Sequence, residues 1–121
     1  MNQKNYTAED VMQTAVVIDS NRTVAHGKLL MERTNTDCLY VKWKDISSAL
    51  FYKSDITENN LKSIIADFAE PCKMSVVSST DLAYILRLLY EENLFSLLVM
   101  KQGKCIGVIT RDTLRKDGFI Q

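Results

Sequence analysis

The sequence has few of the residues that usually mark a catalytic or metal site. It holds one histidine, His26, and three cysteines; Cys38, Cys72 and Cys105 are too widely spaced for the close pairs of zinc or redox motifs. The short motifs of serine hydrolases, zinc proteases and P-loop nucleotide hydrolases are also missing. We therefore expect no enzyme, no metal site and no required cofactor, and we expect the three thiols to be reduced.

The charge balance and the short apolar runs argue against a nucleic-acid-binding protein and against a membrane-spanning one. Lys and Arg together number 15, as do Asp and Glu, and no basic stripe with interleaved aromatic residues occurs. Nucleic acid is therefore a poor partner. The apolar run at residues 94–100 is far shorter than the roughly 20 residues of a membrane span, and the polar start is unlike a signal peptide. We expect a cytoplasmic chain with no direct membrane insertion.

What the chain does have is an internal repeat. Leu39 aligns with Leu97 and Ala49 with Gly107 at one offset (97 − 39 = 58), and no gap is needed between residues 20 and 56. Apolar-on-apolar matches over that length indicate a duplicated half. The chain of 121 residues, 46% of them apolar, suits one compact domain. We predict a single module over residues 1–121, with repeats at 7–56 and 64–115.

Each half is predicted to read strand, helix, strand, strand, helix. The first half is expected to contain strands at 15–18, 38–41 and 48–52, a helix from Thr23 to Asn35, a hairpin tip at 43–45, and a helix from Ser54 whose apolar stripe runs through Leu61, Ile64, Ile65 and Phe68. The second is expected to contain strands at 73–77, 95–100 and 105–109, and a helix at 81–92 capped by Ser79 or Thr80. A short helix is expected to open at Thr7, with Asp10 as its acid.

The most informative stretch is residues 104–114, where an apolar strand passes directly into a helix. Thr110 is placed to cap that helix, and Asp112 lies in its first turn. The unpaired N–H groups of a helix that opens at the end of a strand point at one spot. Such a junction suits an anion or a phosphate. On its own, Thr110 is equally well explained as an ordinary helix cap.

Several motifs of the chain resemble a tandem pair of cystathionine-β-synthase (CBS) domains, a Bateman module. They are Asp-Val-Met at 10–12, Asp-Phe-Ala-Glu-Pro at 67–71, and the two strand-to-helix ends at 49–55 and 107–113. The resemblance covers nearly the whole chain. It implies an α+β fold in which two β-α-β-β-α repeats pack through their sheets as one pseudo-twofold module. It also implies a regulatory role, with adenosine ligands bound in clefts between the repeats.

The family's adenosine-binding pattern is Gly-x-x-Thr/Ser-x-x-Asp, in which the Asp accepts the ribose hydroxyls. The second half keeps Gly107 and Thr110 but has Thr113 in place of the Asp. The first half keeps Asp55 but has Tyr52 in place of the hydroxyl residue, and that ring would intrude on a small phosphate pocket. These departures leave two hypotheses open, a nucleotide-binding module and a structural module whose sites have decayed.

The leading hypothesis is a regulatory module that binds AMP, ATP or cyclic di-AMP in the cleft between the repeats. Thr110 and Arg111 would meet phosphate, while Val108, Ile109 and the strand at 73–76 would form an apolar floor under the base. The predicted ligand-binding residues are Thr110, Arg111, Asp112, Thr113, Val108, Ile109, Met74, Val76, Asp55, Tyr52 and Val16.

The chain is also similar to the C-terminal CBS pair in the ATP-binding subunit of osmoprotectant ABC transporters, which import glycine betaine, carnitine or choline. That similarity implies a linked or partner ATPase, which the module would control. The predicted partners are a second copy, bound through the helical faces of the CBS pair, and this transporter subunit. The alternatives are a purely structural or dimerising module and an ionic-strength sensor that acts through surface charge.

Overall fold

A computed structural model of the protein describes residues 5–43, 48–72 and 74–121. Part of the predicted hairpin tip at 43–45 and the first residue of the predicted strand at 73–77 lie outside them. The chain divides into two compact units, which we name the central unit (residues 15–72) and the terminal unit (residues 1–14 with 73–121). Each unit contains one four-stranded sheet.

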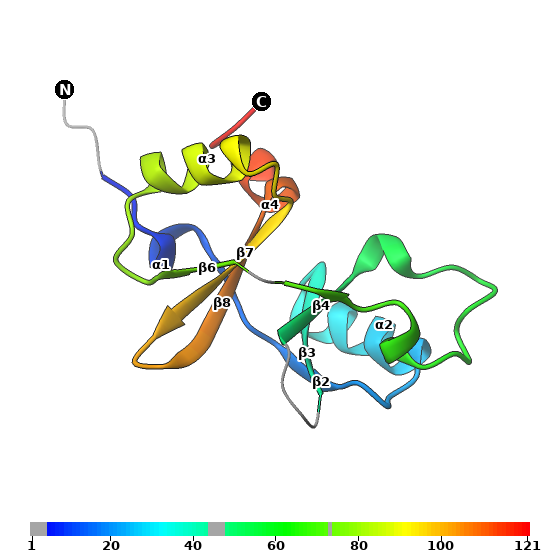
Figure 1. The fold of residues 1–121 in the computed structure, drawn as a ribbon. Helices are drawn as coiled ribbons and strands as arrows, with labels where there is room; N and C mark the ends of the chain where they lie inside the picture. Colours follow the sequence, from blue (N-terminus) through cyan, green and yellow to red (C-terminus); the bar gives the residue numbers. More distant parts are fainter. Residues whose placement is uncertain (1–4, 44–47, 73) are drawn as a thin grey trace. The chain divides into compact units, whose positions relative to one another are not determined.

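The sheet of the central unit has the strand order β2-β3-β4-β5, and helix α2 packs against it (Figure 1). β2 is parallel to β3, and the other pairs are antiparallel. The elements are β2 (Val17–Asp19), α2 (Val24–Thr34), β3 (Cys38–Lys42), β4 (Ser48–Tyr52), the 3₁₀ helices η1 (Lys53–Asp55) and η2 (Ile65–Asp67), and β5 (Glu70–Pro71). The core consists of the buried residues Ile18, Val24, Met31, Leu39, Val41, Ala49, Phe51 and Ile65.

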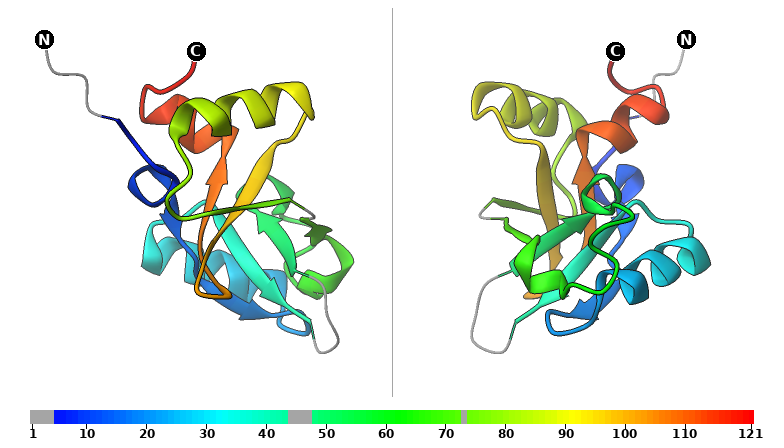
Figure 2. Two further views of the ribbon diagram at one scale, coloured as in Figure 1. Left: turned by 60° about the vertical axis from the view of Figure 1, so that its left-hand side comes forward. Right: turned by 90° about the vertical axis from the view of Figure 1, so that its right-hand side faces the viewer.

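The sheet of the terminal unit has the order β1-β8-β7-β6, with helices α3 and α4 lying side by side (Figure 2). Only β6 and β7 are parallel. The elements are α1 (Ala8–Val11), β1 (Gln13–Thr14), β6 (Ser75–Val77), α3 (Leu82–Glu91), β7 (Ser96–Lys101), β8 (Lys104–Thr110) and α4 (Arg111–Lys116). The core consists of the buried residues Ala8, Val11, Val76, Ile85, Leu89, Leu97, Val99, Ile109 and Leu114.

The two sheets share their strand registers at the repeat offset. Ile18 pairs with Val41 on the parallel strands β2 and β3, and the residues 58 positions later, Val76 and Val99, pair on β6 and β7. The edge strands follow the same scheme, because β5 pairs with β4 as β1 pairs with β8. The two units therefore exchange edge strands. β1 directly precedes β2 of the central unit in the chain but pairs with β8 of the terminal unit, and β5 precedes β6 of the terminal unit but pairs with β4 of the central unit.

The prediction of one strand at 15–18 was wrong. Residues 13–14 pair with β8 in the terminal unit, whereas residues 17–19 pair with β3 in the central unit. The β-branched residues suit an extended chain, but the chain leaves one sheet at this point and joins another. Residue composition alone cannot predict that residues 13–14 and 17–19 pair with strands of different sheets.

The predicted helix from Ser54 is also absent from the described residues, which have only the single turn η1 there. Side chains bind the backbone instead. The Asp55 carboxylate accepts the Tyr52 N–H at 3.2 Å, while the Asn60 side chain accepts from the Thr57 N–H at 2.9 Å and donates to the Asp55 carbonyl at 2.8 Å. Such local bonds compete with helical ones. Ile65 still reaches the core, from the 3₁₀ turn η2.

The N-cap of helix α3 lies one residue after Thr80, the later of the two predicted caps. Its N-cap is Asp81, without a side-chain capping bond, in place of Ser79 or Thr80. The N-terminal segment supplies the missing partner, because the Leu82 N–H donates to the Tyr6 carbonyl at 2.9 Å. A long-range contact has therefore replaced a local cap.

Other local predictions are confirmed. The helix predicted from Thr23 to Asn35 is α2, in which Thr23 is the N-cap that accepts the His26 N–H and Asn35 ends the helix in the left-handed conformation with φ of 54°. Thr7 and Asp10 form a capping box at α1. Within the part of the chain that the structure describes, every helix is too short or too polar to span a bilayer.

Candidate functional site

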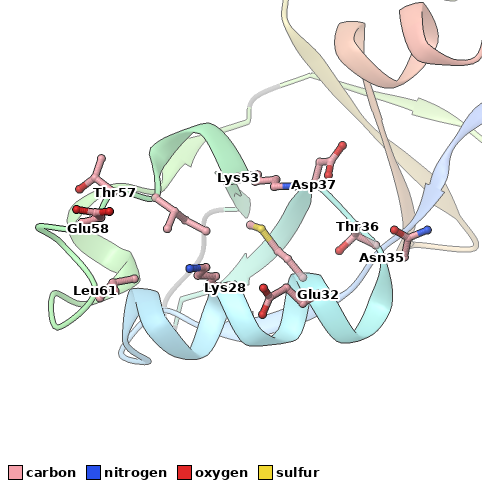
Figure 3. A pocket seen from close by; sticks show the side chains of 11 residues that line it. Lys28, Glu32, Asn35, Thr36, Asp37, Lys53, Thr57, Glu58 and Leu61 are labelled. Carbon is pink, nitrogen blue, oxygen red and sulfur yellow. The ribbon is translucent and has the colours of Figure 1, made fainter.

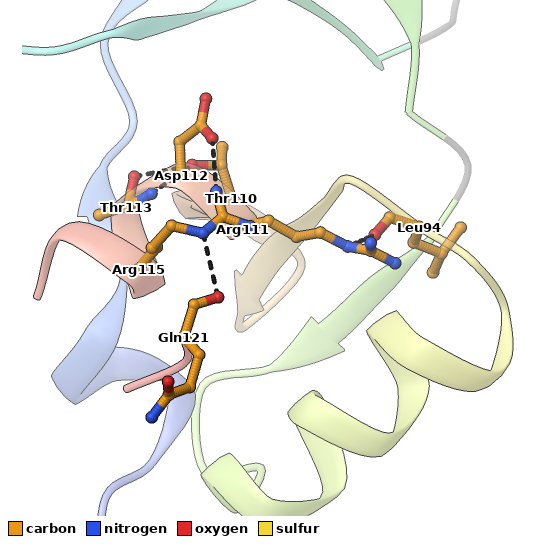
Figure 4. Close-up of polar contacts among 7 residues, drawn as sticks. All are labelled: Leu94, Thr110, Arg111, Asp112, Thr113, Arg115 and Gln121. Atoms are coloured by element: carbon orange, nitrogen blue, oxygen red, sulfur yellow. Dashed lines mark hydrogen bonds and ion pairs between the residues drawn. The ribbon is translucent and has the colours of Figure 1, made fainter. Parts of the chain in front are cut away.

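The strand-to-helix junction between β8 and α4 forms as the sequence predicts, with Thr110 as the N-cap (Figure 4). Its hydroxyl accepts the Thr113 N–H at 3.1 Å and lies 2.7 Å from the Thr113 hydroxyl. Only 4% of Thr110 and 9% of Thr113 is exposed. Both hydroxyl groups therefore take part in a buried internal network, which a phosphate would have to open.

A third member of this network, Gln13, lies about a hundred residues away in the sequence. It is on β1, opposite Val108 of β8, and its side-chain nitrogen donates to the Thr113 hydroxyl at 2.5 Å. The Gln13 Oε1 is buried and has no hydrogen-bond partner among the described residues. Sequence reasoning missed Gln13, because only the pairing of β1 with β8 brings it to the junction.

Gly107 has a packing role at the same place. A Cβ atom there would lie 2.2 Å from the Met12 sulfur and 2.7 Å from the Gln13 carbonyl oxygen. Real Cβ atoms essentially never come so close, so only glycine lets the segment before β1 approach β8 this tightly. The protein therefore needs the glycine of the Gly-x-x-Thr/Ser-x-x-Asp pattern at this position for its own packing, with or without a ligand.

The two charged residues at the start of α4 are engaged in intramolecular contacts. The half-buried Arg111 donates from Nε to the Leu94 carbonyl at 2.6 Å (Figure 4). It also donates from Nη2 to the Leu89 carbonyl at 2.7 Å. It therefore joins α4 to the C-terminal end of α3. The exposed Asp112 forms an ion pair with Arg115 at 3.2 Å. Exposed pairs of this kind contribute little to stability.

The remaining predicted site residues fall into the two units. The terminal unit holds the apolar floor, in which Val76, Val108 and Ile109 are buried and Met74 is half-buried. The central unit holds Val16, Tyr52 and Asp55, all half-buried. The structure brings Thr110, Thr113 and Gln13 together, and it brings Tyr52 and Asp55 together. Whether the two groups serve one ligand stays a prediction.

The three cysteines form no disulfide in the described part of the chain, and they differ in burial. Cys38 is 4% exposed, whereas Cys72 and Cys105 are half-buried. Burial, followed by the nearby Cys72, Asp55 and Asp37, raises the pKa of the Cys38 thiol well above its usual range. A protonated thiol is a poor nucleophile, so Cys38 is a core residue.

Comparison with known families agrees with the fold just described. The model of the CBS domain matches residues 65–117, which run from η2 to the end of α4. The junction at Thr110 and the side chain of Arg111 lie within these matched residues. No curated protein sequence matches the chain.

Solved CBS structures extend the likeness over almost the whole chain. A hexameric CBS-CP12 protein from bloom-forming cyanobacteria has a TM-score of 0.77 at 16% identity, covering 97% of this chain and 74% of its own. The CBS domain of the bacterial CNNM/CorC family Mg²⁺ transporter in complex with ATP has a TM-score of 0.68 at 17% identity (93% and 86% covered). The cytosolic domain of the Mg²⁺ channel MgtE in complex with ATP has 0.68 at 18% (93% and 48% covered). At these identities the likeness is evidence of the fold, which is the mixed α+β fold of CBS-domain structures.

Proposed function

We propose that the chain is a regulatory, non-catalytic CBS-pair module that binds an adenine nucleotide and thereby controls a linked protein. The observation that carries the proposal is the match of the CBS-domain model to residues 65–117, in a chain whose fold resembles CBS structures solved with ATP. A module of this kind acts by binding one conformation more tightly than another, which shifts the population of its linked domain.

In this proposal the nucleotide binds at the junction of β8 and α4, where the predicted residues keep their roles. Thr110 and Arg111 meet the phosphates, and Val108, Ile109 and Met74 lie against the base. Phosphate binding then requires Thr110 to give up its bond to the Thr113 hydroxyl. Breaking a satisfied buried bond costs about 1 kcal/mol, so nucleotide binding is coupled to a local rearrangement at the start of α4.

We further propose that the linked protein is the ATP-binding subunit of an osmoprotectant ABC transporter, so that the module works on the cytosolic side of a membrane as a homodimer. The sequence resemblance described above supports this assignment. Two of the compared structures belong to Mg²⁺ transport proteins, and another is hexameric. Cyclic di-AMP is the nucleotide to test first beside AMP and ATP, because a two-fold symmetric ligand suits a dimer.

Calorimetric titration of the 121-residue chain with AMP, ATP and cyclic di-AMP tests the proposal. Saturable heat is expected for at least one of them. The Thr110→Val variant should weaken that binding, because it removes the hydroxyl and keeps the side-chain shape. Thr23→Val is the matched control, since Thr23 caps α2 with the same 3.1 Å bond to a backbone N–H, away from the predicted phosphate contacts. Absence of heat at millimolar nucleotide would refute the proposal for these ligands.

A second candidate function is a structural or dimerising module. It is favoured by the internal use of the predicted phosphate ligands, since both threonine hydroxyls and the Arg111 guanidinium already have partners in the chain. Sedimentation would then show a tight dimer that forms without nucleotide, and no nucleotide would change the melting temperature. An ionic-strength sensor would differ from both, because the association of two copies would change with added salt.

A further inference from the structure

Helix α3 and the turn after it expose large apolar side chains. Tyr84, Tyr90 and Phe95 are 53%, 84% and 43% exposed. A single exposed apolar residue is ordinary on a protein surface, whereas several that lie close together on one helix indicate a contact surface. The inner face of the helix is already used, because Ile85 and Leu89 belong to the core of the terminal unit.

The equivalent helix of the central unit carries polar side chains instead. Lys28 and Glu32 project from α2 beside an open pocket of mixed charge (Figure 3). At the repeat offset of 58, the residues Tyr84, Leu86, Tyr90 and Phe95 correspond to His26, Lys28, Glu32 and Asp37, all of which are exposed. Polar side chains suit contact with water, so the two helices differ in the neighbour that their outer faces favour.

Two open pockets meet on the outer side of α3. One, of about 350 Å³, lies at the N-terminal end of the helix, where Tyr6 and Leu82 line it. The other, of about 340 Å³, lies where α3 runs beside α4, and its lining includes Tyr90 and Ile120 (Figure 2). Leu86 lines both pockets. The two hollows and the side chains between them therefore form one surface of the terminal unit, which we name the α3 surface.

The two ends of the α3 surface differ in charge. Asp81 lines the first pocket, and its carboxylate makes no hydrogen bond or ion pair with any residue that the structure describes. Arg111 and Arg115 line the second pocket. Arg115 is exposed, with an ion pair to Asp112 as its contact to a charged group. The α3 surface thus has a negative end and a positive end.

A second copy of the α3 surface is complementary to the first. In a twofold contact both molecules use the same surface, so residue i meets residue j where j meets i. Positions i and i+4 lie on one face of a helix. If α3 packs antiparallel on its copy with Leu86 at the axis, Tyr90 of each molecule therefore lies over Leu82 of the other. The same arrangement brings the positive end of each surface to the negative end of its copy.

We propose that the terminal unit binds a second copy of the chain through α3, packed antiparallel about a twofold axis at Leu86. The ring of Tyr90 fills the first pocket of the second copy, between Tyr6 and Leu82, and Arg115 lies beside Asp81. The dimer expected from the sequence used the helical faces of both repeats, whereas here the polar face of α2 takes no part. This inference rests on the homodimer of the proposed function and names its surface.

The size of the α3 surface sets the kind of dimer to expect. A helix of 10 residues is about 15 Å long, so the contact is smaller than the interface of a permanent complex. The dimer should therefore form reversibly. The Tyr90 ring supplies the main attraction, because aromatic side chains that enter a pocket dominate binding. The charges set the orientation more than the affinity, since exposed pairs are weak.

Sedimentation of the 121-residue chain over a range of concentrations tests the proposal. The wild type should show a reversible dimer. Tyr90→Glu gives α3 the residue type that α2 has at Glu32, and it should weaken association by about tenfold or more, because it places a charge in an apolar pocket. Leu29→Glu is the matched control, since it makes the same kind of exchange at an exposed apolar residue of α2 and should leave association unchanged. A monomeric wild type, or a dimer that Tyr90→Glu leaves intact, would overturn the proposal.

Cross-linking and charge exchange test the antiparallel arrangement. Leu86→Cys should form an intermolecular disulfide on mild oxidation, because the two side chains meet at the axis. Lys28→Cys, at the equivalent position of α2, should give only the background of the wild type. Asp81→Arg and Arg115→Asp should each weaken the dimer by about threefold, and the double variant should recover wild-type association. A dimer that Leu86→Cys does not cross-link, or a double variant without recovery, would contradict the arrangement.

Calorimetry with AMP and ATP on the same variants separates this inference from the proposed function. A chain that binds nucleotide but dimerises through another surface would refute the α3 contact alone. A chain that dimerises through α3 and gives no heat with nucleotide would refute the nucleotide proposal and support the α3 contact.

Discussion

Replacing Gly107 by alanine tests whether the close approach of β8 to the segment before β1 is as tight as the structure has it. The added Cβ would meet the Met12 sulfur at 2.2 Å and the Gln13 carbonyl oxygen at 2.7 Å. The sulfur is the end of a flexible side chain and can move. The carbonyl belongs to a backbone that pairs with β8, so it can move only by loosening that pairing.

The two energetic effects of this substitution oppose each other. Overpacking a tight contact costs about 1–3 kcal/mol, while exchanging glycine for alanine within a strand returns about 0.5–1 kcal/mol of chain entropy. Because the Gln13 carbonyl belongs to the backbone, the overpacking cost falls in the upper half of its range, about 2–3 kcal/mol. The net loss is therefore about 1–2.5 kcal/mol, which corresponds to a melting temperature lower by about 4–10 °C in a chain of this size. Urea denaturation followed by circular dichroism measures the loss directly.

A double-mutant cycle with Met12→Ala separates the contact from other causes. Removing the Met12 side chain should recover part of the cost of Gly107→Ala, giving a coupling of about 0.5 kcal/mol or more. The control is Gly103→Ala, which is strained by its φ of +79° but has no neighbouring atom within 4 Å. Its cost should not depend on residue 12. The steric argument is wrong if the Gly107→Ala variant has the melting temperature of the wild type. It is also wrong if the losses of unfolding free energy of Gly107→Ala and Met12→Ala simply add in the double variant.

Three further outcomes are expected. Thr110→Ala should destabilise the protein by about 1 kcal/mol more than Thr23→Ala in urea denaturation, because both remove a helix cap but only Thr110 also leaves buried polar partners unsatisfied; equal losses would contradict the buried network. Arg111→Lys should cost about 2 kcal/mol in the same assay, because an ammonium cannot donate to both carbonyls at the end of α3; an unchanged midpoint would count against this link. The free energy of unfolding should fall as pH rises above about 9, because the unfolded Cys38 ionises near its usual pKa of about 8.5 while the folded thiol, with its raised pKa, stays protonated. This contribution is fully present below the unfolded pKa, so Cys38→Ala should remove that part of the pH dependence, whereas Cys72→Ala at a half-buried site should remove less.

Local sequence signals predicted the parts of the fold that neighbouring residues determine. Thr23 and Thr110 each cap a helix that follows, and Asn35 ends one, because each acts on backbone groups within a few residues. The helix expected from Ser54 does not form, and the reason is also local. The side chain of Asn60 makes hydrogen bonds to the loop backbone through both its oxygen and its nitrogen. Such bonds compete with those of a helix, and the hydrophobic periodicity of the sequence does not reveal them.

The candidate site was predictable only in part, because its decisive contacts are long-range. The sequence pointed to Thr110 as the residue at the helix start, and the structure places it there. It could not reveal that Gln13 completes the hydroxyl network or that Arg111 binds the end of α3, since strand pairing and helix packing bring those partners together. The internal repeat is the one long-range signal that the sequence carries, and the matched strand registers of the two sheets follow it.

The exchange of edge strands affects the order in which the protein can fold during synthesis. The central unit is one continuous segment, so it is complete once residue 72 has left the ribosome. Residues 6–9 can bind the chain at residues 78–82 first, but β1 must wait for β8, which ends at Thr110, before it gains its strand partner. Translation at about 5–20 residues per second leaves β1 unpaired for some seconds. An early stop that removed β8 would spare the central sheet and deprive β1 of the strand it pairs with.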